Sequence, residues 1–191
     1  MSGRRVGRST AIVALVSARF ALVLVVVALA ACAAATGGSA QTEGAALASV
    51  RSAVDTRYSD VRWVSADTLS SWLASDAPPQ LLDSRARAEF DVSHLAGAVW
   101  IDPDHPDWSV VDPTPARRVV VYCSVGWRSG SIAQQLGDRG RPNVYNLEQG
   151  LFGWANAGRP MVRGGRPATR VHPYDAVWGQ MLLPERRAPL P

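Results

Sequence analysis

The stretch that decides the fold is "VVVYCSVGWRSGS", which runs from Val119 to Ser131. Its first four residues are β-formers that are apolar on both faces, and such a run predicts a central strand of a parallel sheet. The strand stops at Cys123, and a loop of small residues with one arginine leads into a helical pattern with Ile132 and Leu136 on its inner face. A strand, a short loop and a helix in this order indicate an α/β unit.

Further strands and helices alternate around this unit, which predicts an α/β domain with a central parallel sheet flanked by helices. We expect it to span residues 60–163, followed by a C-terminal extension, residues 164–191. Aromatic and apolar residues of the extension are expected to pack back on the domain near the loop at Cys123. These residues are Tyr174, Trp178, Met181 and Leu182.

The first 32 residues have the layout of an export signal, in which arginines precede a short apolar run. The run from Phe20 to Ala31 is shorter than the roughly 20 residues that a membrane-spanning helix needs. Leu29 to Cys32 resembles the lipobox of bacterial lipoproteins, which implies a lipid on Cys32 and an anchored protein of the cell envelope or periplasm. Cleavage after Ala40, with loss of Cys32, is the alternative.

Residues 33–59 are rich in small residues and predict a tether that ends in a short helix.

The charge of the chain argues against a nucleic-acid partner. Four of the 20 basic residues precede Cys32, and all 16 acidic residues follow it, so the mature chain is formally neutral. The sequence contains no lysine, which excludes Schiff-base chemistry and a phosphate-binding loop lysine. Cys123 is the single cysteine after residue 32, so an intrachain disulfide or a cysteine-rich zinc site is excluded too.

The loop at Cys123 combines several features that activate a thiol. Cys123 lies where ligands bind in open α/β sheets, at the carboxyl end of a strand. The helix that follows presents free amides and the positive end of its dipole, and Arg128 adds a positive charge. Gly126 and Ser124 are small enough for the loop amides to turn inward as an anion nest. A lone cysteine is more often an inert core residue, but here every neighbouring feature favours a nucleophile.

Three segments together resemble the rhodanese-like sulfurtransferases, and the resemblance covers about residues 61–162. "LLDSRARAEFDVSHLAGAVWI" is similar to the first signature of that family, "VVVYCSVGWRS" to its active-site loop, and "NLEQGLFGWANAGRPM" to its closing strand and helix. The resemblance implies a three-layer fold, Cys123 as the catalytic nucleophile and no cofactor or metal. It also implies a substrate-binding loop and two possible supporting residues. The loop residues are Ser124, Val125, Gly126, Trp127, Arg128 and Ser129, and the supporting residues are Asp83 and Arg85.

The implied reaction is transfer of sulfur from a donor such as thiosulfate, through a Cys123 persulfide, to cyanide or another thiol. Since no second cysteine is available in the domain, the acceptor must come from outside it. Ser93 and Gln149 replace glycines of the family pattern, and Ser124 stands where many thiosulfate-using members carry a basic residue. The last change leaves the identity of the sulfur donor open.

Two other functions remain as alternatives. Cysteine-based phosphatases and arsenate reductases share this fold, but their loop is one residue longer than the one between Cys123 and Arg128. A non-catalytic rhodanese-like module that binds a partner usually lacks the cysteine, which this chain keeps.

The acidic stretch from Asp102 does not predict a calcium loop, because Asp107 and Pro113 stand where such a loop needs glycine and glutamate.

Overall fold

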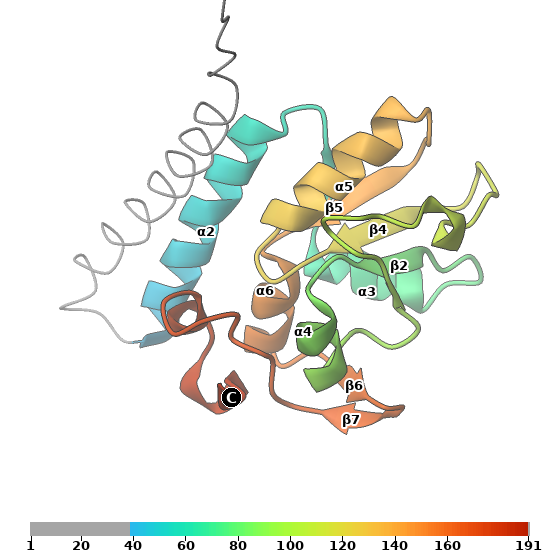
Figure 1. Ribbon diagram of the computed structural model, residues 1–191. Helices are drawn as coiled ribbons and strands as arrows, with labels where there is room; N and C mark the ends of the chain where they lie inside the picture. The colour runs from blue at the N-terminus through green and yellow to red at the C-terminus, as the bar shows by residue number, and fades with distance from the viewer. Residues whose placement is uncertain (1–38, 191) are drawn as a thin grey trace, which may run out of the picture.

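The computed structural model describes residues 39–190 and shows an α/β domain built on one parallel sheet (Figure 1). The sheet has the strand order β1-β5-β4-β2-β3, and all its neighbouring strands are parallel. Strand β4 is central, and its four residues are fully buried because both faces of the sheet are covered. The predicted sheet is therefore confirmed. The strands are β1 (Arg62–Val64), β2 (Gln80–Asp83), β3 (Val99–Trp100), β4 (Val119–Tyr122) and β5 (Val144–Leu147).

The register of the sheet places the ends of three strands at the same edge. Asp83 at the end of β2 pairs with Tyr122 at the end of β4, so Asp83 lies beside the residue that precedes Cys123. On the other side of β4, Val121 pairs with Asn146 of β5. Because parallel strands expose their carboxyl ends together, polar side chains of β2 and β5 flank the loop that follows β4.

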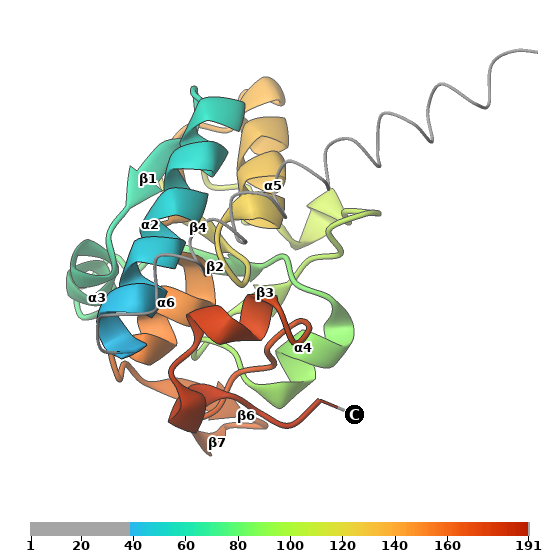
Figure 2. The same ribbon diagram turned by 90° about the vertical axis from the view of Figure 1, so that its left-hand side faces the viewer.

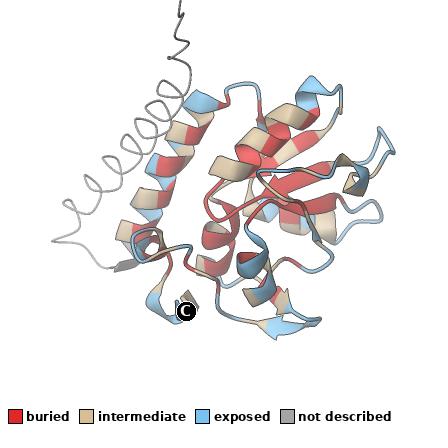
Figure 3. Ribbon diagram, in the orientation of Figure 1, coloured by how far each residue is buried: buried red, intermediate tan, exposed pale blue. Residues whose placement is uncertain are grey.

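Helices cover both faces of the sheet and complete three layers. Helix α5 (Trp127–Asp138) lies on one face and α3 (Ala66–Leu73) on the other, as the two views show (Figures 1 and 2). Helix α3 begins after the N-cap residue Ser65, whose hydroxyl accepts a hydrogen bond from the Thr68 amide. The short helices α4 (Arg87–Val92) and α6 (Gly150–Asn156) follow β2 and β5. Buried residues concentrate in the sheet and on the inner sides of these helices (Figure 3).

The predicted tether is wrong over most of its length, because residues 39–57 form a long helix. Helix α2 (Ser39–Arg57) buries Leu47, Val50 and Val54 against the core and runs beside α5 (Figure 1). These three residues recur at helical spacing, but alanines and serines surround them and dilute the apolar pattern. The packing also involves Gly130, where a Cβ atom would lie 2.6 Å from the ring of Tyr58.

The C-terminal extension packs on the domain, as predicted. The expected boundary between residues 163 and 164, however, falls inside a β-hairpin. Strands β6 (Met161–Arg163) and β7 (Arg166–Ala168) pair antiparallel across residue 164. Beyond them, Val171 pairs with Arg187 and closes a loop that holds two 3-10 turns, η3 (Trp178–Met181) and η4 (Pro184–Arg186). Met181 and Leu182 are buried. A third such turn, η2 (Trp108–Val110), interrupts the proline-rich loop before β4.

The predicted export signal and Cys32 lie outside the described residues. Within residues 39–190, no helix has both the length and the apolar character needed to cross a membrane.

Candidate active site

Cys123 lies at the carboxyl end of β4 with its thiol turned into the following loop. The Gly126 amide donates to the Sγ atom at 3.2 Å, so the predicted inward turn of the loop is present. Gly126 is the N-cap of α5 and has a φ of 102°, a conformation that glycine adopts without strain. Cys123 itself is only 1 % exposed. The sulfur therefore lies at the bottom of a closed loop, and Val125 in that loop is also buried.

The surroundings of the thiol favour its thiolate form. Burial alone would raise the pKa of Cys123, but the Arg128 charge and hydrogen bonds from Ser129 and Val125 outweigh burial and lower that pKa below its ordinary value. Ser129 contributes through both its hydroxyl and its amide. These donors lie at the start of α5, where the helix dipole also stabilises negative charge. The geometry is that of an activated nucleophile.

Arg128 is held by Glu89, so it is not the free positive charge that the sequence suggests. Its Nη1 and Nη2 atoms donate to the two Glu89 carboxylate oxygens at 2.6 and 3.0 Å. Nη2 also donates to the Ser124 hydroxyl, which in turn donates to Glu89. The Ser124 side chain is therefore committed to this pair, although the sequence predicts it as a substrate-binding residue.

Glu89 accepts four hydrogen bonds, of which three join α4 to the loop after Cys123. One carboxylate oxygen accepts from Arg128 and from the Ala86 amide at the start of α4, and the other accepts from Arg128 and Ser124. Burial would raise the pKa of Glu89, yet the hydrogen bonds and charge of Arg128 bring it below its usual range. Because each Glu89 carboxylate oxygen already accepts two hydrogen bonds, its role is to hold the loop in place. Glu89 lies within the segment "LLDSRARAEFDVSHLAGAVWI" that resembles the first family signature, and this was the sequence signal for the position.

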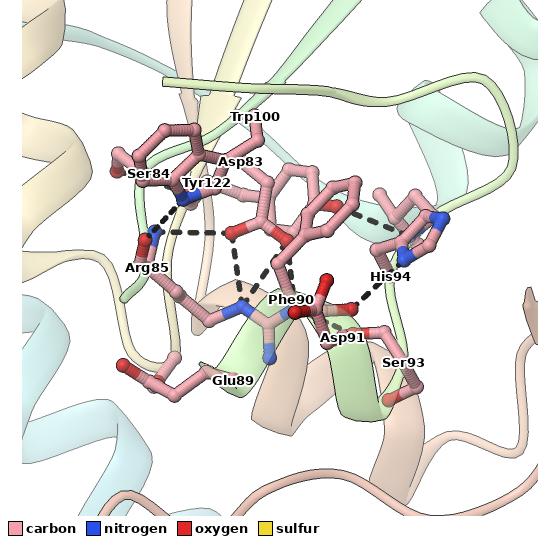
Figure 4. A network of polar contacts seen from close by, with 12 residues as sticks. Asp83, Ser84, Arg85, Glu89, Phe90, Asp91, Ser93, His94, Trp100 and Tyr122 are labelled. Atoms are coloured by element: carbon pink, nitrogen blue, oxygen red, sulfur yellow. Dashed lines mark hydrogen bonds and ion pairs between the residues drawn. The ribbon is translucent and has the colours of Figure 1, made fainter. Parts of the chain in front are cut away.

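Asp83 and Arg85 form an internal ion pair beneath the loop and do not line it. Both side chains are completely buried, and the Arg85 guanidinium lies between the Asp83 carboxylate and the Ser93 carbonyl oxygen (Figure 4). The resemblance implied only that they are possible supporting residues of the site. They pair with each other, and their role is to support the strand ends. The Tyr122 hydroxyl, next to Asp83, accepts from the Leu95 amide and tightens the same cluster.

Asn146 is a supporting residue that sequence reasoning missed. Its side-chain amide donates to the Gly126 carbonyl at 2.8 Å, and its oxygen accepts from the Ser129 hydroxyl at 2.8 Å. Asn146 is fully buried on β5, so it ties that strand to both ends of the turn around the sulfur. A buried polar residue in the strand pattern "NVYNL" was the available signal, because such a group needs partners.

The C-terminal extension reaches the loop through Tyr174. The Arg128 guanidinium carbon lies 5.1 Å from the centre of the Tyr174 ring, which is 42 % exposed. Tyr174 has a φ of 68°, which is uncommon for a residue with a side chain. Trp127, predicted as a residue of the substrate-binding loop, is half-buried and meets the ring of Tyr58 edge to face. The rim of the site is thus aromatic and includes residues outside the three signature segments.

No metal centre accompanies these residues in the part of the chain that the structure describes. There, no group of three or more histidine, cysteine, aspartate or glutamate side chains gathers closely enough to hold an ion.

Comparisons with known proteins agree with this architecture. The rhodanese-like domain family matches residues 65–157. An uncharacterized protein of Synechocystis sp. is 32 % identical over 104 residues, which cover 54 % of this chain but only 58 % of that protein. A crystal structure of the thiosulfate sulfurtransferase from Pseudomonas aeruginosa matches with a TM-score of 0.53 and 23 % identity, covering 69 % of this chain and 26 % of that one. This structural likeness establishes the fold.

A thiosulfate sulfurtransferase of Actinobacillus succinogenes is similar to this chain over most of its own length. It is 34 % identical over 93 residues, which cover 42 % of this chain and 73 % of that protein. The sheet order, the cysteine at the end of the central strand and this match lead to one assignment. The chain belongs to the rhodanese-like family.

Proposed function

We propose that the protein is a sulfurtransferase in which Cys123 accepts a sulfur atom from a small donor and passes it to a thiol or cyanide. The observation that carries this proposal is the convergence of hydrogen-bond donors and the Arg128 charge on the Sγ atom, which lowers the pKa of Cys123. A thiolate is the reactive form of cysteine, and a persulfide is a larger anion that needs the same donors. The thiosulfate sulfurtransferase of A. succinogenes supports the same chemistry.

The proposed reaction has two displacements. In the first, the Cys123 thiolate attacks the outer sulfur of the donor, the donor's sulfur bond breaks, and the leaving group departs with its electron pair. In the second, an external nucleophile attacks the outer sulfur of the persulfide and regenerates the Cys123 thiolate. The amides of Val125, Gly126 and Ser129 stabilise negative charge on sulfur through both steps, as an oxyanion hole stabilises oxygen.

The loop geometry also separates this proposal from its rivals. Four residues lie between Cys123 and Arg128, and the cysteine is 1 % exposed, so the site suits the narrow end of a sulfur donor better than a tetrahedral oxyanion. A module that only binds a partner has no need of a depressed thiol pKa. Catalysis therefore explains the hydrogen bonds around Cys123 better than phosphate transfer or simple binding.

Mass spectrometry of the intact protein tests the proposal. We expect the purified protein to gain one sulfur atom after treatment with thiosulfate or cysteine persulfide, and to lose it to cyanide with release of thiocyanate. Cys123→Ser should gain none, whereas Cys32→Ser, which removes the other cysteine of the chain, should behave as the wild type. Equal sulfur transfer by the wild type and Cys123→Ser would show that Cys123 is not the nucleophile.

We also propose that the chain is exported and anchored in the cell envelope by a lipid on Cys32. The support is the arginine-led apolar run and the sequence Leu29 to Cys32. Expression of the full chain in a bacterial host should give a membrane-associated protein, and Cys32→Ala should release it from the membrane fraction. A soluble wild-type protein whose N-terminus begins after Ala40 would instead support cleavage without a lipid.

A further inference from the structure

The positive charge beside Cys123 is neutralised within the protein. Arg128 and Glu89 make two parallel hydrogen bonds, the strongest geometry for an arginine and a carboxylate. The Glu89 side chain is 3 % exposed, so water does not separate the two charges. The Arg128–Glu89 pair as a whole is therefore neutral toward a molecule that approaches the loop, although the guanidinium still acts on the Cys123 sulfur at short range.

The groups next to the Arg128–Glu89 pair add no free positive charge. Asp83 and Arg85 form a second, fully buried neutral pair below it. Ser124 presents a hydroxyl that is already hydrogen-bonded to Arg128 and Glu89. The aromatic ring of Tyr174 lies over the Arg128 guanidinium and presents apolar surface at the rim. Once Cys123 is a thiolate, these groups together carry a net negative charge.

We propose that the site takes sulfur from organic persulfides of low net charge and discriminates against dianionic donors such as thiosulfate, with Glu89 as the residue that sets this preference. The inference rests on the sulfurtransferase function proposed above and specifies its donor. Glu89 acts through Arg128, so it is a positioning residue for the charge of that side chain.

The charges of the two reactions explain the preference. A persulfide is more acidic than a thiol, so where Cys123 is a thiolate the donor is the monoanion R–S–S⁻. The Cys123 thiolate bonds to the outer sulfur, the bond between the two donor sulfurs breaks, and R–S⁻ leaves with the electron pair. Two negative charges are present before and after the step. With thiosulfate, the thiolate must meet a dianion and a sulfite dianion must leave. Like charges at such short range repel strongly in a water-poor site.

Donor preference and salt dependence of the wild-type protein give the first test. We expect cysteine persulfide to load Cys123 with a second-order rate constant at least about tenfold above that for thiosulfate, followed by intact mass. Sodium chloride should leave the thiosulfate rate unchanged or raise it, because screening weakens repulsion. A thiosulfate rate that equals the persulfide rate, or that falls steeply with salt, would overturn the inference.

The substitution Glu89→Gln tests the residue directly. Loss of the carboxylate charge should free Arg128 and raise the ratio of thiosulfate to persulfide rate constants by about tenfold. Asp91→Asn is the matched control, because Asp91 lies on the same helix α4, is 56 % exposed and pairs with Arg87 instead. We expect this control to keep the wild-type ratio. A ratio that changes equally in both variants would contradict a specific role for Glu89.

A second pair of variants keeps the test valid if Glu89→Gln fails to fold. Tyr174 is well exposed, and Tyr174→Lys and Tyr174→Gln both remove the ring but differ by one positive charge beside Arg128. The lysine variant should use thiosulfate several-fold better than the glutamine variant, with similar persulfide rates. Equal thiosulfate rates in the two would count against the charge argument. If the wild type takes sulfur from neither donor, the sulfurtransferase function fails together with the inference, whereas efficient use of thiosulfate removes the inference alone.

Discussion

The side-chain nitrogen of Asn146 lies 2.8 Å from the carbonyl oxygen of Gly126, and this hydrogen bond fixes the turn around Cys123 to the neighbouring strand β5. The Asn146 oxygen accepts from the Ser129 hydroxyl, so Asn146 and the Cys123 sulfur compete for the one proton of that hydroxyl, while the Ser129 amide stabilises the thiolate independently. One buried amide therefore orients two sides of the loop. The acidity of the thiol depends on a residue that lies on a different strand from it.

Asn146→Ala should destabilise the fold and loosen the turn around Cys123 together. It removes one of two hydrogen bonds to the Gly126 carbonyl, which keeps the Gly130 amide as a donor, and it removes the acceptor of the buried Ser129 hydroxyl, which costs about 1–3 kcal/mol in the free energy of unfolding. Asn146→Asp keeps the shape but places a negative charge near Cys123, so it should raise the thiol pKa. Urea denaturation and titration of the thiolate ultraviolet absorbance measure the two effects. An unchanged thiol pKa in both variants would mean that Asn146 does not position the loop.

Much of this arrangement could be predicted from local sequence, and the rest depends on contacts between distant segments. The run before Cys123 is apolar on both faces, and this alone predicts a central parallel strand. Helix α2 escaped prediction because its apolar residues stand among alanines and serines. The pairing of Arg128 with Glu89, 39 positions away, depends on where α4 is placed by the sheet. The spacing of apolar residues along the sequence does not predict a contact between such distant segments.

Ser129→Ala should raise the pKa of Cys123. Burial already disfavours the thiolate, so the Arg128 charge and the Ser129 hydrogen bonds are needed to bring the pKa below its usual value. Alkylation by iodoacetamide, followed against pH, should show its inflection at a higher pH in the variant than in the wild type. Ser131→Ala, on the same helix but with its hydroxyl bonded to Gln135, is the control and should leave the profile in place. A Ser129→Ala profile that matches the wild type would contradict the assignment.

Glu89 should make the stability of the protein depend on pH in the acidic range. Its pKa in the folded protein lies below the ordinary value, so its contribution to stability is fully present above the pKa of the unfolded chain and is lost as the pH falls through the folded pKa. Urea unfolding of the wild type across this range should show that loss. In Glu89→Gln the overall stability should be lower by about 3–5 kcal/mol, as for other broken buried ion pairs, and the dependence on acidic pH should flatten. Parallel slopes in the two proteins would contradict a depressed pKa for Glu89.

Gly150→Ala should disturb the loop at Cys123 from the side of α6. A Cβ atom at this position would lie 2.5 Å from the Cys123 carbonyl oxygen and 2.6 Å from that of Ser124, and neither backbone group can move freely. Gly150 also has a φ of 55°, so the substitution adds backbone strain. We expect lower stability and at least about tenfold slower loading of Cys123 with sulfur, because displaced reacting groups lose their alignment. Gly137→Ala, in open space on α5, is the control, and equal effects of the two substitutions would argue against a role of Gly150 in shaping the loop.

The C-terminal extension should be an integral part of the fold. Leu182 is fully buried and follows η3, next to the point where the Asn156 amide donates to the Met181 carbonyl. Leu182→Ala should therefore lower the free energy of unfolding by about 2–5 kcal/mol, as expected for a large-to-small substitution in a packed core. Leu190→Ala is the matched control, because Leu190 is 43 % exposed and should change stability little. If Leu182→Ala unfolds at the same urea concentration as the wild type, the extension packs too loosely on the domain to hold Tyr174 over Arg128. Tyr174 would then not be part of the rim of the site.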